Sequence, residues 1–254
     1  MAKLENEEKI RKELAPVLSS LIDDTLKAGG VAGLELESAV LFGSAVGKSY
    51  VPKKSDVNIF MVFDRTDVAL LKELTPIFRR YYKKLKAYPV VIDRDFIENS
   101  RDVFPMEFLE WKERSVVFFG KDPLEGVDIS LDNLRLQIEE NLRGKRMKLI
   151  QSFFDLDPKR GKLQEFIEDT LPNFLTVLRN ILRLMCETPH RETQAVLDTV
   201  EEKTGVSLTN MRRFYCMKTD GVKIDRQESE ILFKGMLDEL AELTKVIDRF
   251  DTCQ

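Results

Sequence analysis

The sequence predicts an α+β protein, in which an N-terminal α/β domain with a mixed sheet, residues 1–128, precedes an all-α helical bundle domain, residues 129–254. Three observations lead to this prediction. Runs rich in β-branched and aromatic residues alternate with helical periodicity as far as residue 120. Beyond about residue 130 only helical periodicity remains. The length of 254 residues suits one large domain or two of ordinary size.

Two amphipathic helices are predicted in the first half. Apolar residues at helical spacing run from roughly Glu5 to Lys27, and Gly29-Gly30 is expected to end this helix. Residues 67–87 show the same spacing. Residues 104–114 are ambiguous between helix and strand, although their large aromatic residues fall on one helical face.

Four runs in the first half are predicted as strands because they are rich in β-branched and aromatic residues. They are ESAVLF, which ends at Phe42, and residues 56–64, 88–93 and 115–120. A loop with two glycines and a proline separates the first two strands, and the helix at residues 67–87 precedes the third. This alternation predicts helices packed on a sheet.

The second half is predicted to contain four amphipathic helices. They cover residues 131–154, 163–186, 191–205 and 226–250. Each repeats apolar residues with the period of a helix, as in Leu240, Leu243, Ile247 and Phe250 of the last one. Gly, Pro and Asp mark the joints between them. A helical bundle follows from this pattern.

Composition excludes several classes of function. A net charge of −4 and a pI near 5.4 argue against a nucleic-acid partner. A single histidine, His190, and three cysteines without metal-ligand spacing argue against a zinc site or a Ser–His–Asp triad. The charged N-terminus and the lack of a long apolar run predict a cytoplasmic protein with no membrane partner. The sequence leaves open whether the protein forms a homo-oligomer.

The stretch LFGSAVGKSY, residues 41–50, looks at first like a phosphate-binding P-loop. A Walker A loop requires four residues between its two glycines, whereas only three separate Gly43 from Gly47. Phe42 occupies the place of the missing glycine, and Pro52 follows where a P-loop would open into a helix. A P-loop is therefore not expected.

A different pattern fits the same residues. An apolar strand ends in Gly43-Ser44, and Asp56 opens the next strand after a spacer of eleven residues. This motif, with the helices and strands around it, resembles the nucleotidyltransferase superfamily typified by DNA polymerase β and kanamycin nucleotidyltransferase. The helical second half is similar to the helical domain that often accompanies bacterial members.

The resemblance implies a site for a nucleoside triphosphate (NTP) and Mg²⁺. Nucleotidyl transfer usually holds the attacking and leaving oxygens with Mg²⁺, which prefers carboxylate oxygens. The implied metal ligands are Asp56 and the residue two positions later, Asn58, because side chains i and i+2 of a strand point the same way. The implied nucleotide-binding residues are Gly43, Ser44, Lys48, Lys53 and Lys54, although the lysines also fit a solvated loop. The acceptor would be a small molecule, a protein or an RNA.

Two departures put transfer activity in question. Active family members have Asp or Glu where this chain has Asn58, which can ligate a metal but carries no charge. The third acid usually lies inside the later strand, but here Asp93 stands at its end, where it either reaches back to the site as a catalytic residue or caps a turn. The sequence thus favours a pseudoenzyme with a decayed metal site. The alternative is an active Mg²⁺-dependent nucleotidyltransferase that uses Asp56, Asn58 and Asp93.

The basic run RRYYKKLK, residues 79–86, belongs to the second predicted helix. It fits either a solvated helix face or an RNA-contacting patch. Tyr81 and Tyr82 are adjacent and so point in different directions, which does not form a stacking ladder.

Overall fold

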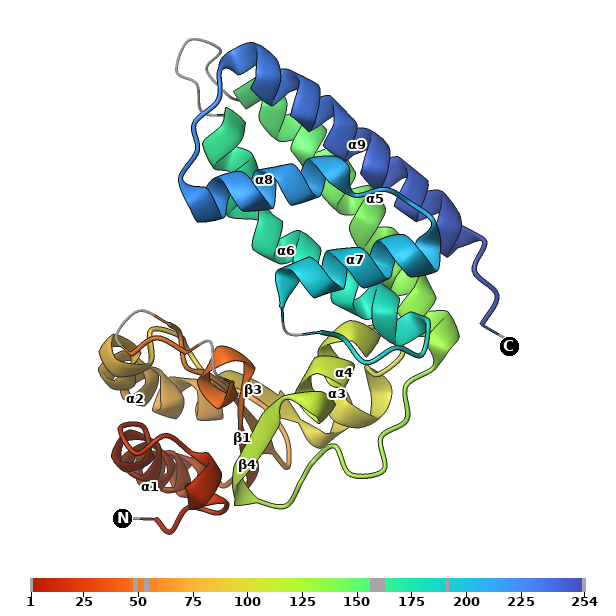
Figure 1. Ribbon diagram of the computed structural model, residues 1–254. Coiled ribbons are helices and arrows are strands. Elements are labelled where there is room, and N and C mark those ends of the chain that lie inside the picture. The colour runs from red at the N-terminus through yellow and green to blue at the C-terminus, as the bar shows by residue number, and fades with distance from the viewer. Residues whose placement is uncertain (1, 48–49, 53–54, 156–162, 191, 253–254) are drawn as a thin grey trace. The chain divides into compact units, whose positions relative to one another are not determined.

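A computed structural model describes residues 2–47, 50–52, 55–155, 163–190 and 192–252 (Figure 1). The chain divides into two compact units, Met1–Ile129 and Ser130–Gln254. The first unit contains a four-stranded sheet and the second consists of helices. The α+β fold class predicted from the sequence is confirmed.

The sheet has the strand order β3-β2-β1-β4. Its strands are β1 (Leu36–Phe42), β2 (Asn58–Phe63), β3 (Val90–Asp93) and β4 (Ser115–Gly120). The central strand β1 is antiparallel to both β2 and β4, whereas β2 and β3 are parallel. The sheet is therefore mixed, as predicted.

Helices cover both faces of this sheet, because side chains of a strand alternate between its faces. Leu41, Ile59 and Met61 join one core cluster with α1 (Ala15–Ala32) and α2 (Val68–Leu85). Val40, Phe60 and Val62 join the opposite cluster with α3 (Arg94–Asn99) and α4 (Pro105–Glu113). The ambiguous stretch at residues 104–114 is thus helical.

The N-terminal helix differs from the prediction at both ends. A short 3-10 helix η1 (Glu7–Lys9) comes first, and α1 begins only at Ala15 with Pro16 in its first turn. Proline suits this position because the first turn needs no hydrogen-bonded N–H. The helix passes through Gly29 and Gly30 and ends at Gly33, which has a left-handed φ of 70°. The glycine pair is therefore not the helix stop.

The segment before α1 lies along β4. The backbone N–H of Glu5 donates to the carbonyl of Phe118 at 3.0 Å, and the Asn6 side chain donates to the carbonyl of Val117 at 3.0 Å. These bonds satisfy part of the outer edge of β4, on which no further strand pairs among the residues that the structure describes. The N-terminal segment of unit 1 is thereby attached to the last strand of its sheet.

The second unit contains α5 (Leu131–Asp155), α6 (Leu163–Leu184), α7 (Thr193–Thr204), α8 (Thr209–Asp220) and α9 (Arg226–Asp248). Helix α5 packs beside α9 and α6 (Figure 1). The sequence predicted four of these helices and missed α8, which buries only Met211, Phe214 and Met217. Among the described residues, none of the helices has the length and apolar character that a membrane span needs.

Candidate active site

A tight turn follows β1 at the end of the sheet. Gly43 has a φ of +73°, which other residues rarely adopt, and it opens the 3-10 helix η2 (Gly43–Val46). The N–H of Gly47 donates to the carbonyl of Ser44 at 3.0 Å. Gly43 and Ser44 thus lie in a compact turn that directly follows Phe42, the last residue of β1.

Asn58 lies beside this turn, because it pairs with Phe42 across the two antiparallel strands. A Cβ atom added to Gly43 would stand 3.1 Å from Nδ2 of Asn58. The side chain of Asn58 therefore occupies the space next to the glycine. Ser115, the first residue of β4, pairs with the other side of Phe42. The structure thus brings Asn58 next to the turn that contains Gly43 and Ser44.

Asp56 precedes β2 by two residues and is exposed. The N–H of the next residue, Val57, donates to the carbonyl of Leu85 at 2.7 Å, which fixes the chain at this point. Asp56 makes no hydrogen bond or ion pair with any residue in the part of the chain that the structure describes. Its carboxylate is therefore accessible to a ligand.

Asp93 lies far from Asp56 and Asn58, which corrects the expectation that it reaches back to them. In the parallel pairing of β2 and β3, Asp93 stands opposite Phe63, at the other end of β2 from Asn58. Phe63 is five residue steps from Asn58 along β2, a distance of about 17 Å at ~3.3 Å per residue. The β3 residue closest to Asn58 in this register is Val90, which offers no oxygen ligand.

Asp93 has a structural role instead. Its side chain accepts the Phe96 N–H at 3.0 Å as the N-cap of α3, and it accepts the Thr66 hydroxyl at 2.7 Å. The bond from Thr66 lowers the pKa of Asp93, although partial burial opposes this. The interpretation of Asp93 as a cap is the one that its contacts support.

Arg11 ties the N-terminal segment to the turn, and sequence reasoning missed it. Its Nε atom donates to the carbonyl of Ala45 at 3.2 Å and its Nη2 atom to the carbonyl of Gly47 at 2.5 Å. The guanidinium also lies 4.8 Å from the centre of the Tyr50 ring. No signal in the sequence pointed to Arg11, since it is one of several charges in an N-terminal helical pattern.

The donors at this end of the sheet fit a pair of Mg²⁺ ions poorly. Asp56 supplies one carboxylate, Asn58 a neutral amide, and Val90 nothing. Within the described ranges, no three His, Cys, Asp or Glu side chains gather as a metal centre would require. A single Mg²⁺ that keeps its waters and phosphate oxygens needs only one or two carboxylates, so Asp56 suits one nucleotide-bound ion at most. Lys48, Lys53 and Lys54 lie outside the described residues.

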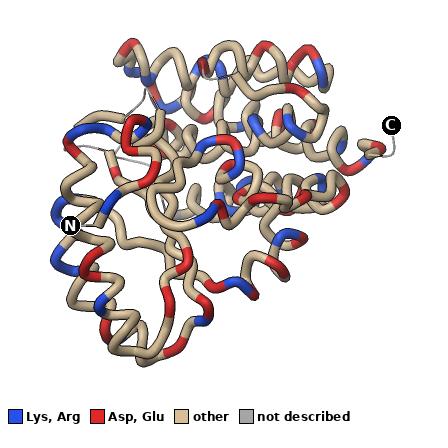
Figure 2. The backbone as a smooth tube through the Cα atoms, turned by 90° about the horizontal axis from the view of Figure 1, so that it is seen from below, with Lys and Arg blue, Asp and Glu red and all other residues tan. Residues whose placement is uncertain are grey.

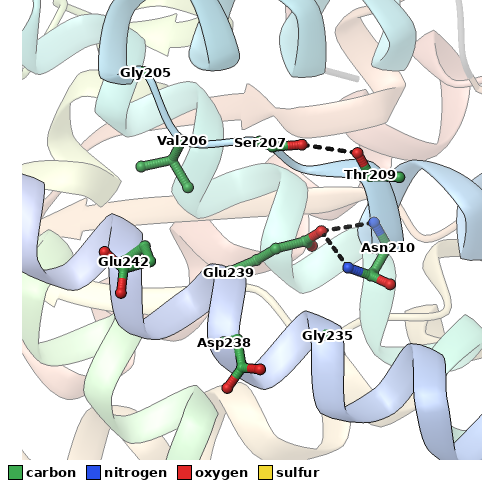
Figure 3. A pocket seen from close by; sticks show the side chains of 9 residues that line it. All are labelled: Gly205, Val206, Ser207, Thr209, Asn210, Gly235, Asp238, Glu239 and Glu242. Atoms are coloured by element: carbon green, nitrogen blue, oxygen red, sulfur yellow. Dashed lines mark hydrogen bonds between the residues drawn. The ribbon is translucent and has the colours of Figure 1, made fainter.

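A hollow of about 500 Å³ lies in the helical unit between the α7–α8 loop and α9 (Figure 3). Its main feature is the Glu239 carboxylate, which is 7% exposed. Glu239 accepts the Asn210 N–H at 2.6 Å, the Asn210 side-chain amide at 2.8 Å and the Met211 N–H at 3.1 Å. Burial raises the pKa of Glu239, and these donors oppose that shift. The residue therefore caps α8 from the neighbouring helix.

Comparisons with known proteins identify a shared fold. No protein-family model matches the sequence, and no curated protein matches it either. Among solved structures, the chain is similar to the spectinomycin adenyltransferase of Enterococcus faecialis, in a crystal structure with ATP and spectinomycin. The TM-score is 0.52 with 14% identity, over 93% of this chain and 100% of that chain. This chain thus shares the overall fold of that adenyltransferase.

Proposed function

We propose that this chain binds a nucleoside triphosphate at the Gly43–Val46 turn and transfers its nucleotidyl group slowly or not at all. One observation carries the proposal. Asn58, and not an acid, lies beside the turn, the β3 residue closest to Asn58 in register is Val90, and Asp93 lies at the opposite end of β2.

Charge is the physical reason. Phosphoryl-group chemistry depends mostly on positioning and on electrostatic stabilisation of the developing charge. Two dications close together need several carboxylates to offset their repulsion, and Asp56 supplies one negative charge. The turn, in contrast, requires no acid to bind phosphate, since backbone N–H groups and the Ser44 hydroxyl can donate to phosphate oxygens.

The second candidate is an active Mg²⁺-dependent nucleotidyltransferase. The fold shared with the spectinomycin adenyltransferase favours it, because that protein was crystallised with ATP and a small molecule. In this alternative Asp56 and Asn58 hold one ion, which arrives with the nucleotide. The acceptor is then a small molecule, a protein or an RNA.

Calorimetric titration with ATP, GTP, CTP and UTP, each with and without Mg²⁺, tests the proposal. We expect weak binding that Mg²⁺ changes by less than about threefold. The substitution Asn58→Asp restores a charge beside Gly43 and should make binding depend on Mg²⁺, with affinity rising about tenfold, which corresponds to ~1.4 kcal/mol. Asn99→Asp, on α3, adds the same charge elsewhere and should leave the titration unchanged.

Transfer is measured in the same samples with α-labelled nucleotides. Label transferred by the wild-type protein and abolished by Asp56→Ala would replace the proposal with the active enzyme. A wild-type protein that binds none of the four nucleotides would contradict both.

A further inference from the structure

The C-terminal end of α2 and the residues after it form a surface with concentrated positive charge. Lys, Arg, Asp and Glu are interspersed along most of the chain (Figure 2). From Leu74 to Ile92, however, the sequence contains no acidic residue, and residues 79–86 contain five cations. We call the exposed side chains of this region the cationic-aromatic surface: Arg79, Tyr82, Lys83, Lys84, Lys86 and Tyr88.

Two of its side chains are stacked tyrosines. The rings of Tyr82 and Tyr88 lie 4.6 Å apart at 30°, and the two residues are 43% and 54% exposed. Tyr81 behaves differently, since it is buried and its hydroxyl donates to Asp24 at 3.0 Å. Tyr82 therefore stacks with Tyr88, which follows the helix, and not with its neighbour Tyr81.

The cations of this surface are not neutralised within the fold. Arg80 forms an ion pair with Asp24 at 3.0 Å. Arg79, Lys83, Lys84 and Lys86 have no acidic partner among the residues that the structure describes. Lysines in the last turn stabilise a helix through its dipole, but that effect does not require half-exposed aromatic rings beside them.

We propose that the cationic-aromatic surface binds single-stranded nucleic acid. Bases stack on exposed aromatic faces whatever their sequence, and lysines exposed on the same segment can pair with the phosphates. A duplex hides its base faces, so it engages the lysines alone. The net charge of −4 argues against binding along a long duplex, whereas a patch of four cations matches a few phosphates of one strand.

The surface borders the candidate nucleotide site but does not depend on it. The carbonyl of Leu85, in the last turn of α2, accepts the N–H of Val57, so the chain next to Asp56 is attached to the helix that carries the surface. Binding of a strand here requires neither Mg²⁺ nor a bound nucleoside triphosphate. The inference therefore stands or fails separately from the proposed function.

Fluorescence anisotropy of labelled oligouridine and oligothymidine of about 12 nucleotides tests the inference on the full chain, between about 50 and 200 mM salt. We expect a Kd below about 100 µM at the lowest salt and weaker binding of a duplex of equal length. The plot of log affinity against log salt should have a slope of about −2 to −3, from ~0.7 per phosphate contact.

Two sets of variants separate charge from stacking. The triple variant Lys83→Gln, Lys84→Gln, Lys86→Gln should weaken binding at least about tenfold and reduce the slope by about 2. Its control, Lys12→Gln, Lys121→Gln, Lys148→Gln, removes equal charge from exposed lysines elsewhere. Tyr88→Leu should weaken binding about tenfold without changing the slope, whereas Tyr88→Phe, which keeps the ring, should bind like the wild type.

Three results would overturn the inference: no binding at the lowest salt, equal loss in the two lysine triples, or no effect of Tyr88→Leu. Vesicles with anionic lipids serve as a further arm. The protein could bind these vesicles as strongly as it binds the oligonucleotide, and Tyr88→Leu could leave that binding unchanged. This result would show that the surface binds polyanions in general, and it would also reject the proposal that it binds single-stranded nucleic acid. Thermal unfolding of each variant confirms that it is folded.

Discussion

Two consecutive glycines in α1 have very different surroundings. A Cβ atom added to Gly29 would stand 2.7 Å from the carbonyl oxygen of Leu34, while one added to Gly30 would meet nothing within 4 Å. Gly29 thus lets the chain after the helix pass close to it. Gly30 has no such contact, and its only effect on the helix is the entropic cost of glycine.

We expect opposite signs for the two alanine variants. Gly30→Ala should stabilise the protein by up to about 1 kcal/mol, because alanine is the better helix former. Gly29→Ala should destabilise it by about 1–3 kcal/mol, since the backbone at Leu34 must move. Urea unfolding followed by circular dichroism measures both. Equal changes in the two variants would show that the close approach to Leu34 has no energetic weight.

The sequence predicts the part of the candidate site whose residues stand at a fixed spacing along the chain. It does not predict the residues that reach the site from distant parts of the sequence. Gly43, Ser44 and Asn58 lie together because an antiparallel pair of strands returns to its starting point. Asp93 stayed open between the site and a cap, because the sequence does not state which end of β3 lies next to Asn58. Arg11 was missed because the carbonyls it holds belong to backbone, which has no sequence signature.

At the scale of the element, α8 depends on a carboxylate from another helix. Its first N–H groups have no partner within the helix, and Glu239 of α9 accepts two of them. Gly235 contributes to this contact, because a Cβ atom there would stand 2.4 Å from the side chain of Asn210. Capping from a distant residue explains why the N-terminus of α8 carries no capping side chain of its own.

Glu239 also makes the stability of the helical unit depend on pH. Its pKa is raised in the folded protein above the ordinary 4.5, so the folded state binds the proton more tightly. The resulting stabilisation is complete below pH 4.5 and is lost as the pH rises through the raised pKa. The variant Glu239→Gln does not titrate there, and it leaves the Met211 N–H without an acceptor, at a cost of about 1–3 kcal/mol.

The measurement is the difference in unfolding free energy between the wild type and Glu239→Gln, taken at several pH values from 4 to about 8. This difference should shrink as the pH rises. Glu242→Gln, at an exposed position on the same helix where Glu242 pairs with Lys245, should show only a small difference. If the difference for Glu239→Gln instead grows with pH, the three hydrogen-bond donors lower the pKa of Glu239 by more than burial raises it.

The elements that the sequence predicted well are those with a long apolar stripe or a run of β-branched residues. Strands β1 to β4 and helices α2, α5, α6, α7 and α9 belong to this group. Helix α8 was missed because its few buried residues stand among charged ones, and the stop of α1 was misplaced because Gly29 serves close packing and not termination. The local sequence pattern indicates which residues are buried, whereas helix α8 and the end of α1 depend on contacts between segments that are distant in the sequence.

At the scale of the molecule, each unit has the means to fold by itself. Unit 1 contains its own two core clusters on the two faces of its sheet, and the helical unit buries apolar residues from all its helices. We expect the fragments 1–129 and 130–254 to give cooperative unfolding transitions when expressed separately, as measured by circular dichroism and calorimetry.

A shorter fragment provides the control. Residues 1–114 lack β4, which pairs with β1 and holds Glu5 and Asn6. We expect this fragment to be unfolded, because one side of the central strand loses its partner and the N-terminal segment loses its bonds to β4. A cooperative transition in 1–114 would show that β4 is dispensable for the unit.

The bonds from Glu5 and Asn6 to β4 also bear on how the chain matures during translation. Glu5 and Asn6 find these partners only after residue 118 has been made. Contacts of such long sequence separation slow folding, because the intervening chain must be ordered first. Until then the nascent unit exposes the edge of β1, so the period before β4 emerges is when chaperone protection from aggregation matters most.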